Sequence, residues 1–112
     1  MNLQNRYFVM IRNCRKTLEL RLFDEKRQQI ERGDEIEFLN IDTGDSLLTI
    51  AEDIITANTF DDLCLLIDIK QTGFNDKTVL LREIKNIYPE TRIRQYGVVA
   101  IKIKIIDNNN NS

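Results

Sequence analysis

Residues 15–22 read Arg-Lys-Thr-Leu-Glu-Leu-Arg-Leu. Leu18, Leu20 and Leu22 alternate with polar residues, which is the period of two that marks a strand with one buried face. Glu19 and Arg21 share the opposite face, where their charges lie close enough to pair. The stretch therefore predicts a half-buried strand whose second face is charged.

The residues that follow predict a hairpin. A Gly-Asp turn pair at residues 33–34 comes before residues 35–40, whose alternation predicts a second strand. A further turn signal, Asp-Thr-Gly-Asp at residues 42–45, sends the chain back into residues 46–57. Their Ile, Leu and Thr content favours a third strand over a helix.

Spacings of three and four between apolar residues predict short helices. One such pattern runs over residues 3–14. A second helix is expected to begin near Phe60, with Asn58 or Thr59 as its N-terminal cap. A third is expected over residues 76–87, followed by a proline that stops it.

These elements favour an α+β fold with a small curled sheet over a doubly wound parallel sheet, because the connections have hairpin length. The alternating residues 97–106 predict a last strand near the interior of the sheet or barrel. We expect one domain over residues 1–106, since 112 residues is the usual size of a single domain. The Asn-rich residues 107–112 have nothing to bury and are expected to form a disordered tail.

Composition argues against several classes of protein. The formal net charge of −2 does not favour indiscriminate binding to nucleic acid. Without histidine and with only two cysteines, the chain predicts no transition-metal site and no cofactor. Charges interrupt every long apolar window, so no membrane span is expected. Two well-separated cysteines, Cys14 and Cys64, fit a reducing cytoplasm in which both act as small packing side chains.

A helix, then Lys16-x-x-Glu19-x-Arg21 on a strand, then a Gly-Asp turn into another strand resembles the ASCH family, a branch of the PUA-like superfamily. Tyr96-Gly97 is similar to the aromatic-glycine lead into the family's closing strand. The resemblance covers nearly the whole chain apart from the tail. It implies a small β-barrel of mixed or antiparallel strands with two to three flanking short helices, and a cleft that faces RNA or a nucleoside.

The resemblance implies that Lys16, Glu19 and Arg21 line this cleft. A carboxylate acceptor beside a planar guanidinium suits a base edge or a phosphate. The alternative, which the pattern alone favours, is a solvated strand face with a surface ion pair worth at most about 1 kcal/mol.

Further residues are candidates for the edge of the cleft. Lys26 and Arg27, with Arg12 and Arg15, are expected to form a local basic rim, and Tyr96 to offer a ring on which an unpaired base stacks. For any one basic residue the ordinary interpretation is an exposed side chain, and for the tyrosine a packed ring with a hydrated hydroxyl.

One branch of the family hydrolyses N4-acetylcytidine with a lysine, a threonine three positions later and a glutamate farther along the chain. Lys16 matches the lysine, but Glu19 occupies the threonine position. The expected place of the later glutamate falls close to Gly73, where the nearest acids are Asp68 and Asp76. Whether the chain is an enzyme is therefore left open, with Lys16 and Glu19 as a candidate base and acid.

Three hypotheses follow for the function. The leading one is a binding module for RNA or a modified nucleoside. The second is a hydrolase of a nucleoside or of RNA, either an amidohydrolase or a ribonuclease. The third is a protein-interaction module whose contact surface is the acidic segment 42–68; residues 41–70 hold one basic and seven acidic side chains, a local charge of −6.

Overall fold

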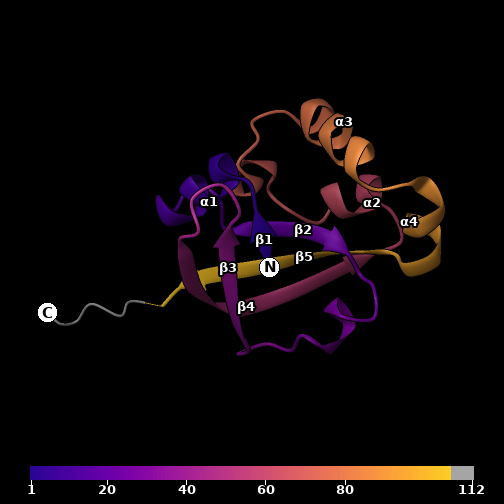
Figure 1. Cartoon of the computed structure of the whole chain (residues 1–112). Coiled ribbons are helices and arrows are strands. Elements are labelled where there is room, and N and C mark those ends of the chain that lie inside the picture. The colour runs from indigo at the N-terminus through magenta and orange to yellow at the C-terminus, as the bar shows by residue number, and fades with distance from the viewer. Residues whose placement is uncertain (107–112) are drawn as a thin grey trace, which may run out of the picture.

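The structure is a computed structural model that describes residues 1–106 (Figure 1). Its strands are β1 (Asn2–Leu3), β2 (Leu18–Leu22), β3 (Glu35–Asn40), β4 (Ser46–Ala57) and β5 (Val98–Ile105). Its helices are α1 (Asn5–Arg12), α2 (Phe60–Cys64), α3 (Lys77–Ile87) and α4 (Glu90–Tyr96), with the short 3₁₀ turns η1 (Arg27–Gln29) and η2 (Ile69–Thr72). The tail expected at residues 107–112 lies outside the described residues.

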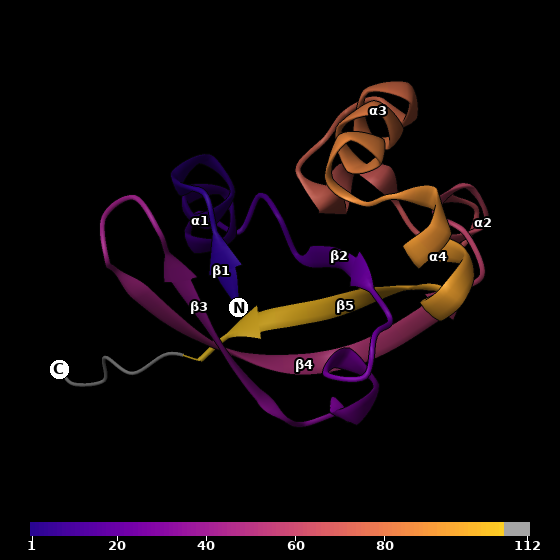
Figure 2. The same ribbon diagram turned by 45° about the vertical axis from the view of Figure 1, so that its right-hand side comes forward.

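The five strands form one sheet in the order β1-β3-β4-β5-β2, in which β1 and β3 are parallel and the other pairs antiparallel. The twelve-residue β4 pairs with β3 and β5 in turn, and a register shift between Ala51 and Asp53 bends it. The sheet therefore curls into a half-barrel (Figure 2). This confirms the predicted α+β fold with a small curled sheet, and α1, α3 and α4 are its three helices of seven or more residues.

Both faces of β5 are buried in its first half, residues 98–101, and each face belongs to a different core. Val98 and Ala100 pack with the leucines of β2 and with α2 and α3. Val99, Ile101 and Ile103 pack on the other side with α1 and β3. As Figures 1 and 2 show, α1 therefore lies on one side of β2, and the group of α2, α3 and α4 lies on the other.

The chain departs from the predicted elements near its first helix. Asn2–Leu3 pairs with β3, so α1 starts at Asn5 rather than at Leu3. It ends at Arg12, two residues before Cys14, whose φ is 61°. Cys14 is exposed, which makes the expectation that it packs inside wrong, whereas Cys64 is buried.

Helix α4 was not predicted from the sequence. Pro89 ends α3 as expected, but it also stands at the N-terminal cap of α4 with φ −63°, and Glu90 lies in the first turn of that helix. A proline at a helix start and an acid in the first turn are both favourable there. Within residues 1–106, no helix has the length and apolar character that crossing a membrane requires.

Candidate ligand-binding cleft

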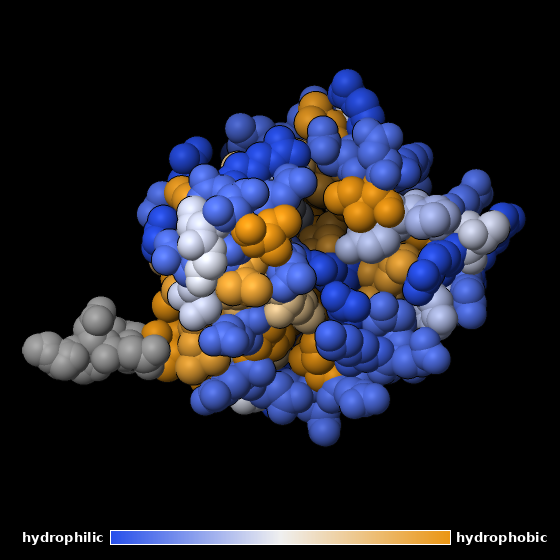
Figure 3. All heavy atoms as spheres, viewed as in Figure 1, coloured by the Kyte–Doolittle hydropathy of each residue, from blue (hydrophilic) through white to orange (hydrophobic). Residues whose placement is uncertain are grey.

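A cleft of about 350 Å³ opens between α1 and α3, with β2 at its floor. Its volume lies in the range of small-molecule sites. Figure 3 shows this face hollowed, with hydrophobic residues inside the hollow and both hydrophilic and hydrophobic residues around it. The charged, amide and hydroxyl side chains that line it are Asn2, Gln4, Arg6, Tyr7, Lys16, Glu19, Arg21, Thr72, Glu83, Asn86 and Tyr88.

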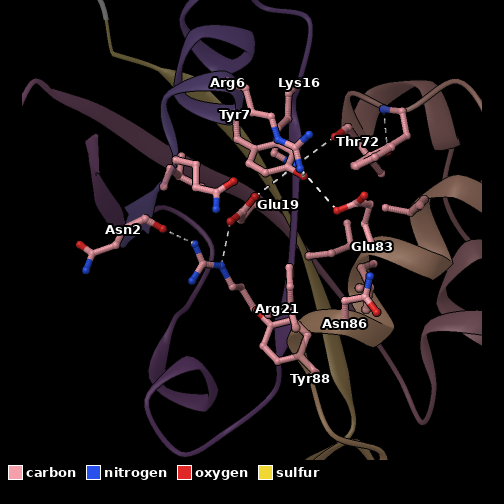
Figure 4. A pocket seen from close by; sticks show the side chains of 17 residues that line it. Asn2, Arg6, Tyr7, Lys16, Glu19, Arg21, Thr72, Glu83, Asn86 and Tyr88 are labelled. Carbon is pink, nitrogen blue, oxygen red and sulfur yellow. Dashed lines mark hydrogen bonds and ion pairs between the residues drawn. The ribbon is translucent and has the colours of Figure 1, made fainter. Parts of the chain in front are cut away.

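Glu19 lies at the centre of a buried ion network (Figure 4). Its Oε1 lies 3.1 Å from the Nζ of Lys16, and its Oε2 accepts a hydrogen bond of 2.8 Å from the Nε of Arg21. The side chains of Lys16 and Glu19 are each 6% exposed and that of Arg21 is 16% exposed. The interpretation as a solvated surface pair is therefore wrong.

Lys16 joins β2 to η2. Its ammonium group donates to the carbonyl oxygen of Leu18 at 2.8 Å and to that of Thr72 at 3.0 Å, in addition to its contact with Glu19. A lysine ammonium has three donors, so each has an acceptor here. This arrangement holds the cleft wall in place and leaves the ammonium no spare donor for a ligand.

Arg21 joins the two edges of the half-barrel. One of its terminal nitrogens donates to the carbonyl oxygen of Asn2 at 2.8 Å, while its Nε is held by Glu19. Asn2 belongs to β1 and Arg21 to β2, the first and last strands in the sheet order. The gap in the sheet is thus bridged by a side chain, and the cleft lies beside that bridge.

The ion network keeps Glu19 charged. Burial by itself would raise the pKa of this carboxyl, but the charges of Lys16 and Arg21, with their hydrogen bonds, outweigh it and lower the pKa below its usual value. At neutral pH Glu19 is therefore a carboxylate that accepts hydrogen bonds. It does not donate a proton in this state.

The opposite wall comes from α3 and the residue after it. Glu83 and Asn86 are three apart and so share one side of the helix, beside the buried Leu80 and Ile84. Tyr88 follows the helix, and its ring stacks on that of Phe60 with centroids 5.8 Å apart. These polar residues were not predicted as site residues; their only sequence signal is the spacing of three next to an apolar helix face.

Helix α1 contributes Arg6 and Tyr7 to the mouth of the cleft. Arg6 donates to the hydroxyl of Tyr7 at 2.7 Å and lies 3.4 Å from a carboxylate oxygen of Glu83. Burial is the main reason why the pKa values of Tyr7 and Tyr88 are raised. Both phenols therefore stay protonated at neutral pH and offer hydroxyl groups to a ligand.

The family model of the ASCH domain matches residues 1–107 of the sequence. The chain belongs to the ASCH domain family. A crystal structure of the hypothetical protein PH0355 is similar, with 33% identity, 95% of this chain and 96% of that chain covered, and a TM-score of 0.84. The solution NMR structure of protein PF0455 from Pyrococcus furiosus matches with 30% identity, 96% of both chains covered and a TM-score of 0.75. No curated protein matches this chain.

In this ASCH domain the sequence-predicted residues fall into two groups. Lys16, Glu19 and Arg21 come together on the floor of the cleft. Outside its lining lie the basic residues Lys26 and Arg27, together with Tyr96, Arg12 and Arg15. Arg27 pairs with Asp24 at 3.1 Å, and the hydroxyl of Tyr96 donates to Glu25 at 3.1 Å. Their part in ligand binding stays a prediction.

The acidic residues of the ASCH domain do not gather in the way a metal site requires. Across residues 1–106, no three His, Cys, Asp or Glu side chains are grouped so that they could hold a metal ion. The two carboxylates of the cleft, Glu19 and Glu83, are each engaged with a cation of the protein.

The lowered pKa of Glu19 predicts an acid-sensitive contribution to stability. A carboxyl whose pKa is depressed on folding stabilises the fold above its unfolded-state value, near 4.5, and loses that contribution as the pH falls through the folded-state value. Urea unfolding from pH 7 to pH 3 should show a steeper loss in the wild type than in Glu19→Gln. Equal losses in the two proteins would assign the acid sensitivity to other carboxyls.

Proposed function

We propose that this ASCH domain binds RNA or a modified nucleoside in the cleft. The observation that carries the proposal is a cleft of about 350 Å³ whose lining combines apolar side chains with tyrosine and amide groups, over a floor fixed by the ion network of Lys16, Glu19 and Arg21. Burying charged side chains is costly, and hydrophobic side chains of similar volume in their place often stabilise a fold as well or better. Stability alone therefore does not account for this ion network. The association of the family with RNA supports the proposal. The proposal includes a cytoplasmic location, which agrees with the two free thiols of Cys14 and Cys64.

The chemistry of the walls suits a nucleobase. Leu80 and Ile84 provide an apolar surface, and Tyr7 and Tyr88 add ring atoms to it. Asn86 brings an amide, which both donates and accepts hydrogen bonds as a base edge requires. A nucleobase, which is a flat ring with polar edges, fits these apolar walls and the amide of Asn86.

The lining favours binding over hydrolysis. The hydroxyl of Thr72 donates to the carbonyl of Ile69 at 2.5 Å and accepts from the amide of Phe74 at 3.3 Å, so it is engaged by the protein itself. Lys16 and Glu19 are engaged with one another and with other partners. A hydrolase would have to use Glu83, whose side chain is 39% exposed, as its base.

The acidic segment 42–68 is a weaker candidate for the functional surface. Asp42 accepts a hydrogen bond of 2.8 Å from the amide of Asn5, and Asp68 accepts one of 3.1 Å from the amide of Lys70. Asp62 lies in the first turn of α2, where a negative charge is favourable. Asp42, Asp62 and Asp68 therefore each have a structural role within the chain.

An RNA strand would reach residues that a single nucleoside does not. Arg27 and its partner Asp24 follow the end of β2, the strand that carries Arg21. Tyr96 is linked to the same segment, because its hydroxyl donates to Glu25. We therefore assign Lys26, Arg27 and Tyr96 to a continuation of the site that a longer single strand contacts.

An NMR titration of the isotope-labelled protein tests the proposal. Nucleosides, N4-acetylcytidine among them, are expected to shift amide signals around Glu19, Arg21 and Asn86, and short single-stranded RNAs to shift those around Tyr96 as well. Asn86→Ala should weaken binding about two- to tenfold, because one hydrogen bond is lost. Lys85→Gln, on α3 outside the cleft lining, is the matched control.

The same samples separate the alternatives. Chromatography of N4-acetylcytidine and of the RNAs after incubation would reveal product if the domain were a hydrolase. Unchanged spectra across the whole panel would contradict the proposal and leave a protein partner as the better hypothesis. Equal losses for Asn86→Ala and Lys85→Gln would show that the ligand binds elsewhere.

A further inference from the structure

We propose that the cleft takes nucleotides in preference to free nucleosides, because Arg6 at its mouth exchanges its contact with Glu83 for a phosphate of the ligand. This inference rests on the proposed function and narrows its ligand class. It identifies the phosphate-bearing unit, whether a nucleoside monophosphate or one nucleotide of an RNA strand, as the group that the site recognises.

The charges of the cleft leave one cation accessible to an anion. The lining holds three cationic side chains against two carboxylates. Lys16 and Arg21, with side chains 6% and 16% exposed, share the carboxylate of Glu19. The side chain of Arg6 is 58% exposed and stands at the mouth. A bound phosphate keeps part of its hydration shell, so it contacts the exposed Arg6. It does not reach the buried Lys16 and Arg21.

The present partner of Arg6 is easily replaced. Its distance to Glu83 is 3.4 Å, and both side chains are substantially exposed. Such surface pairs contribute little, because water screens them. A phosphate offers several oxygens to the planar guanidinium and forms shorter, charge-assisted bonds with it. The exchange therefore replaces a weak contact with a stronger one.

Tyr7 holds Arg6 in position for this exchange. The guanidinium carbon lies 4.6 Å from the centroid of the Tyr7 ring, and one terminal nitrogen donates to the Tyr7 hydroxyl. The ring of Tyr7 also packs on Phe74, with centroids 6.2 Å apart. Arg6 thus has a fixed support on α1 that does not depend on Glu83.

The contact also spans the mouth of the cleft. Arg6 comes from α1 and Glu83 from α3, on the two sides of β2 (Figures 2 and 4). When a phosphate takes Arg6, this link between α1 and α3 is released. A nucleotide whose phosphate binds Arg6 therefore also opens the mouth of the cleft for its own base.

Matched pairs of ligands test the inference. Cytidine, uridine, adenosine and guanosine are each compared with their 5′- and 3′-monophosphates by the same NMR titration, with inorganic phosphate alone as a further probe. At low salt a monophosphate is expected to bind about tenfold or more tightly than its nucleoside, as one charge-assisted contact provides. The preference should shrink as salt is added, because screening weakens an exposed contact.

Variants locate the origin of the preference. Arg6→Gln should abolish the preference for the monophosphate and leave nucleoside binding nearly unchanged, whereas Arg6→Lys should keep part of it. Glu83→Gln should strengthen monophosphate binding severalfold, because the competing carboxylate is gone. Arg82→Gln is the matched control, since Arg82 is an exposed arginine of α3 that lies outside the lining of the cleft.

Each outcome decides between the two proposals. Nucleosides that bind in the cleft as tightly as their monophosphates would overturn this inference and leave the proposed function standing. An equal effect of Arg6→Gln and Arg82→Gln on monophosphate binding would overturn it as well. No shifts around Glu19 and Asn86 with any nucleoside or monophosphate would overturn both. Inorganic phosphate that shifts signals only outside the cleft would contradict the role of Arg6.

Discussion

Replacing Glu19 by alanine is expected to lower the free energy of unfolding by about 3–5 kcal/mol. The substitution removes the carboxylate that Lys16 and Arg21 share, and it leaves two cations in surroundings where their side chains are only 6% and 16% exposed. Breaking a buried ion pair by removing one partner is among the costly single changes in a protein. Urea unfolding monitored by circular dichroism measures the loss.

Other variants show whether the loss comes from the ion network. Glu19→Gln should cost less than Glu19→Ala, because its amide oxygen still accepts a hydrogen bond. Glu35→Ala, at an exposed position of β3, should change the free energy of unfolding by no more than about 0.5 kcal/mol. A triple change of Lys16, Glu19 and Arg21 to Met, Leu and Met should recover most of the stability. A loss in Glu19→Ala as small as that in Glu35→Ala would contradict a stabilising role for the carboxylate.

Replacing Gly97 by alanine is expected to lower the free energy of unfolding by about 2–3 kcal/mol. Gly97 has φ 72° and ψ −168°, a conformation that is open almost exclusively to glycine. An added Cβ would also lie 3.0 Å from the carbonyl oxygen of Ala57, which is backbone of β4 and paired with Val98. Thermal and urea unfolding of the variant measure the cost.

Gly44→Ala is the control for this substitution. Gly44 also has a positive φ, 83°, but nothing lies within 4 Å of an added Cβ. It should therefore cost only the backbone strain of a left-handed residue, about 1 kcal/mol. If both variants lost the same stability, the close approach to Ala57 would contribute nothing. The glycine of the Tyr96-Gly97 pair noted in the sequence has its physical reason in this approach.

The strands were predictable because their signals are local. Residues 35–40 and 46–57 form strands with the bounds that alternation and turn residues predicted. The same alternation placed Glu19 and Arg21 on one face. It did not distinguish solvent from a cleft on that face, because the cover comes from Asn2 of β1 and Tyr7 of α1, which lie outside the strand. Residue pattern within a strand contains no information about what a distant segment places over it.

The opposite wall was not predictable for the same reason. Glu83 and Asn86 look like ordinary polar residues of an amphipathic helix, and only the packing of α3 against the leucines of β2 places them at the cleft. Residue type did not show where Tyr96 lies relative to the cleft. Its hydroxyl donates to Glu25 outside the lining, and its part in binding a longer strand stays a prediction.

The side-chain bridge across the half-barrel also bears on aggregation. An open sheet has two edge strands, and unpaired backbone groups on such edges readily pair with other chains. Here the ammonium of Lys16 covers the carbonyl of Leu18 on β2, and the guanidinium of Arg21 covers that of Asn2 on β1. Charges aimed at both edges make them poor templates for a foreign strand. The residues that build the floor of the cleft thus also protect the open side of the sheet from edge-to-edge association.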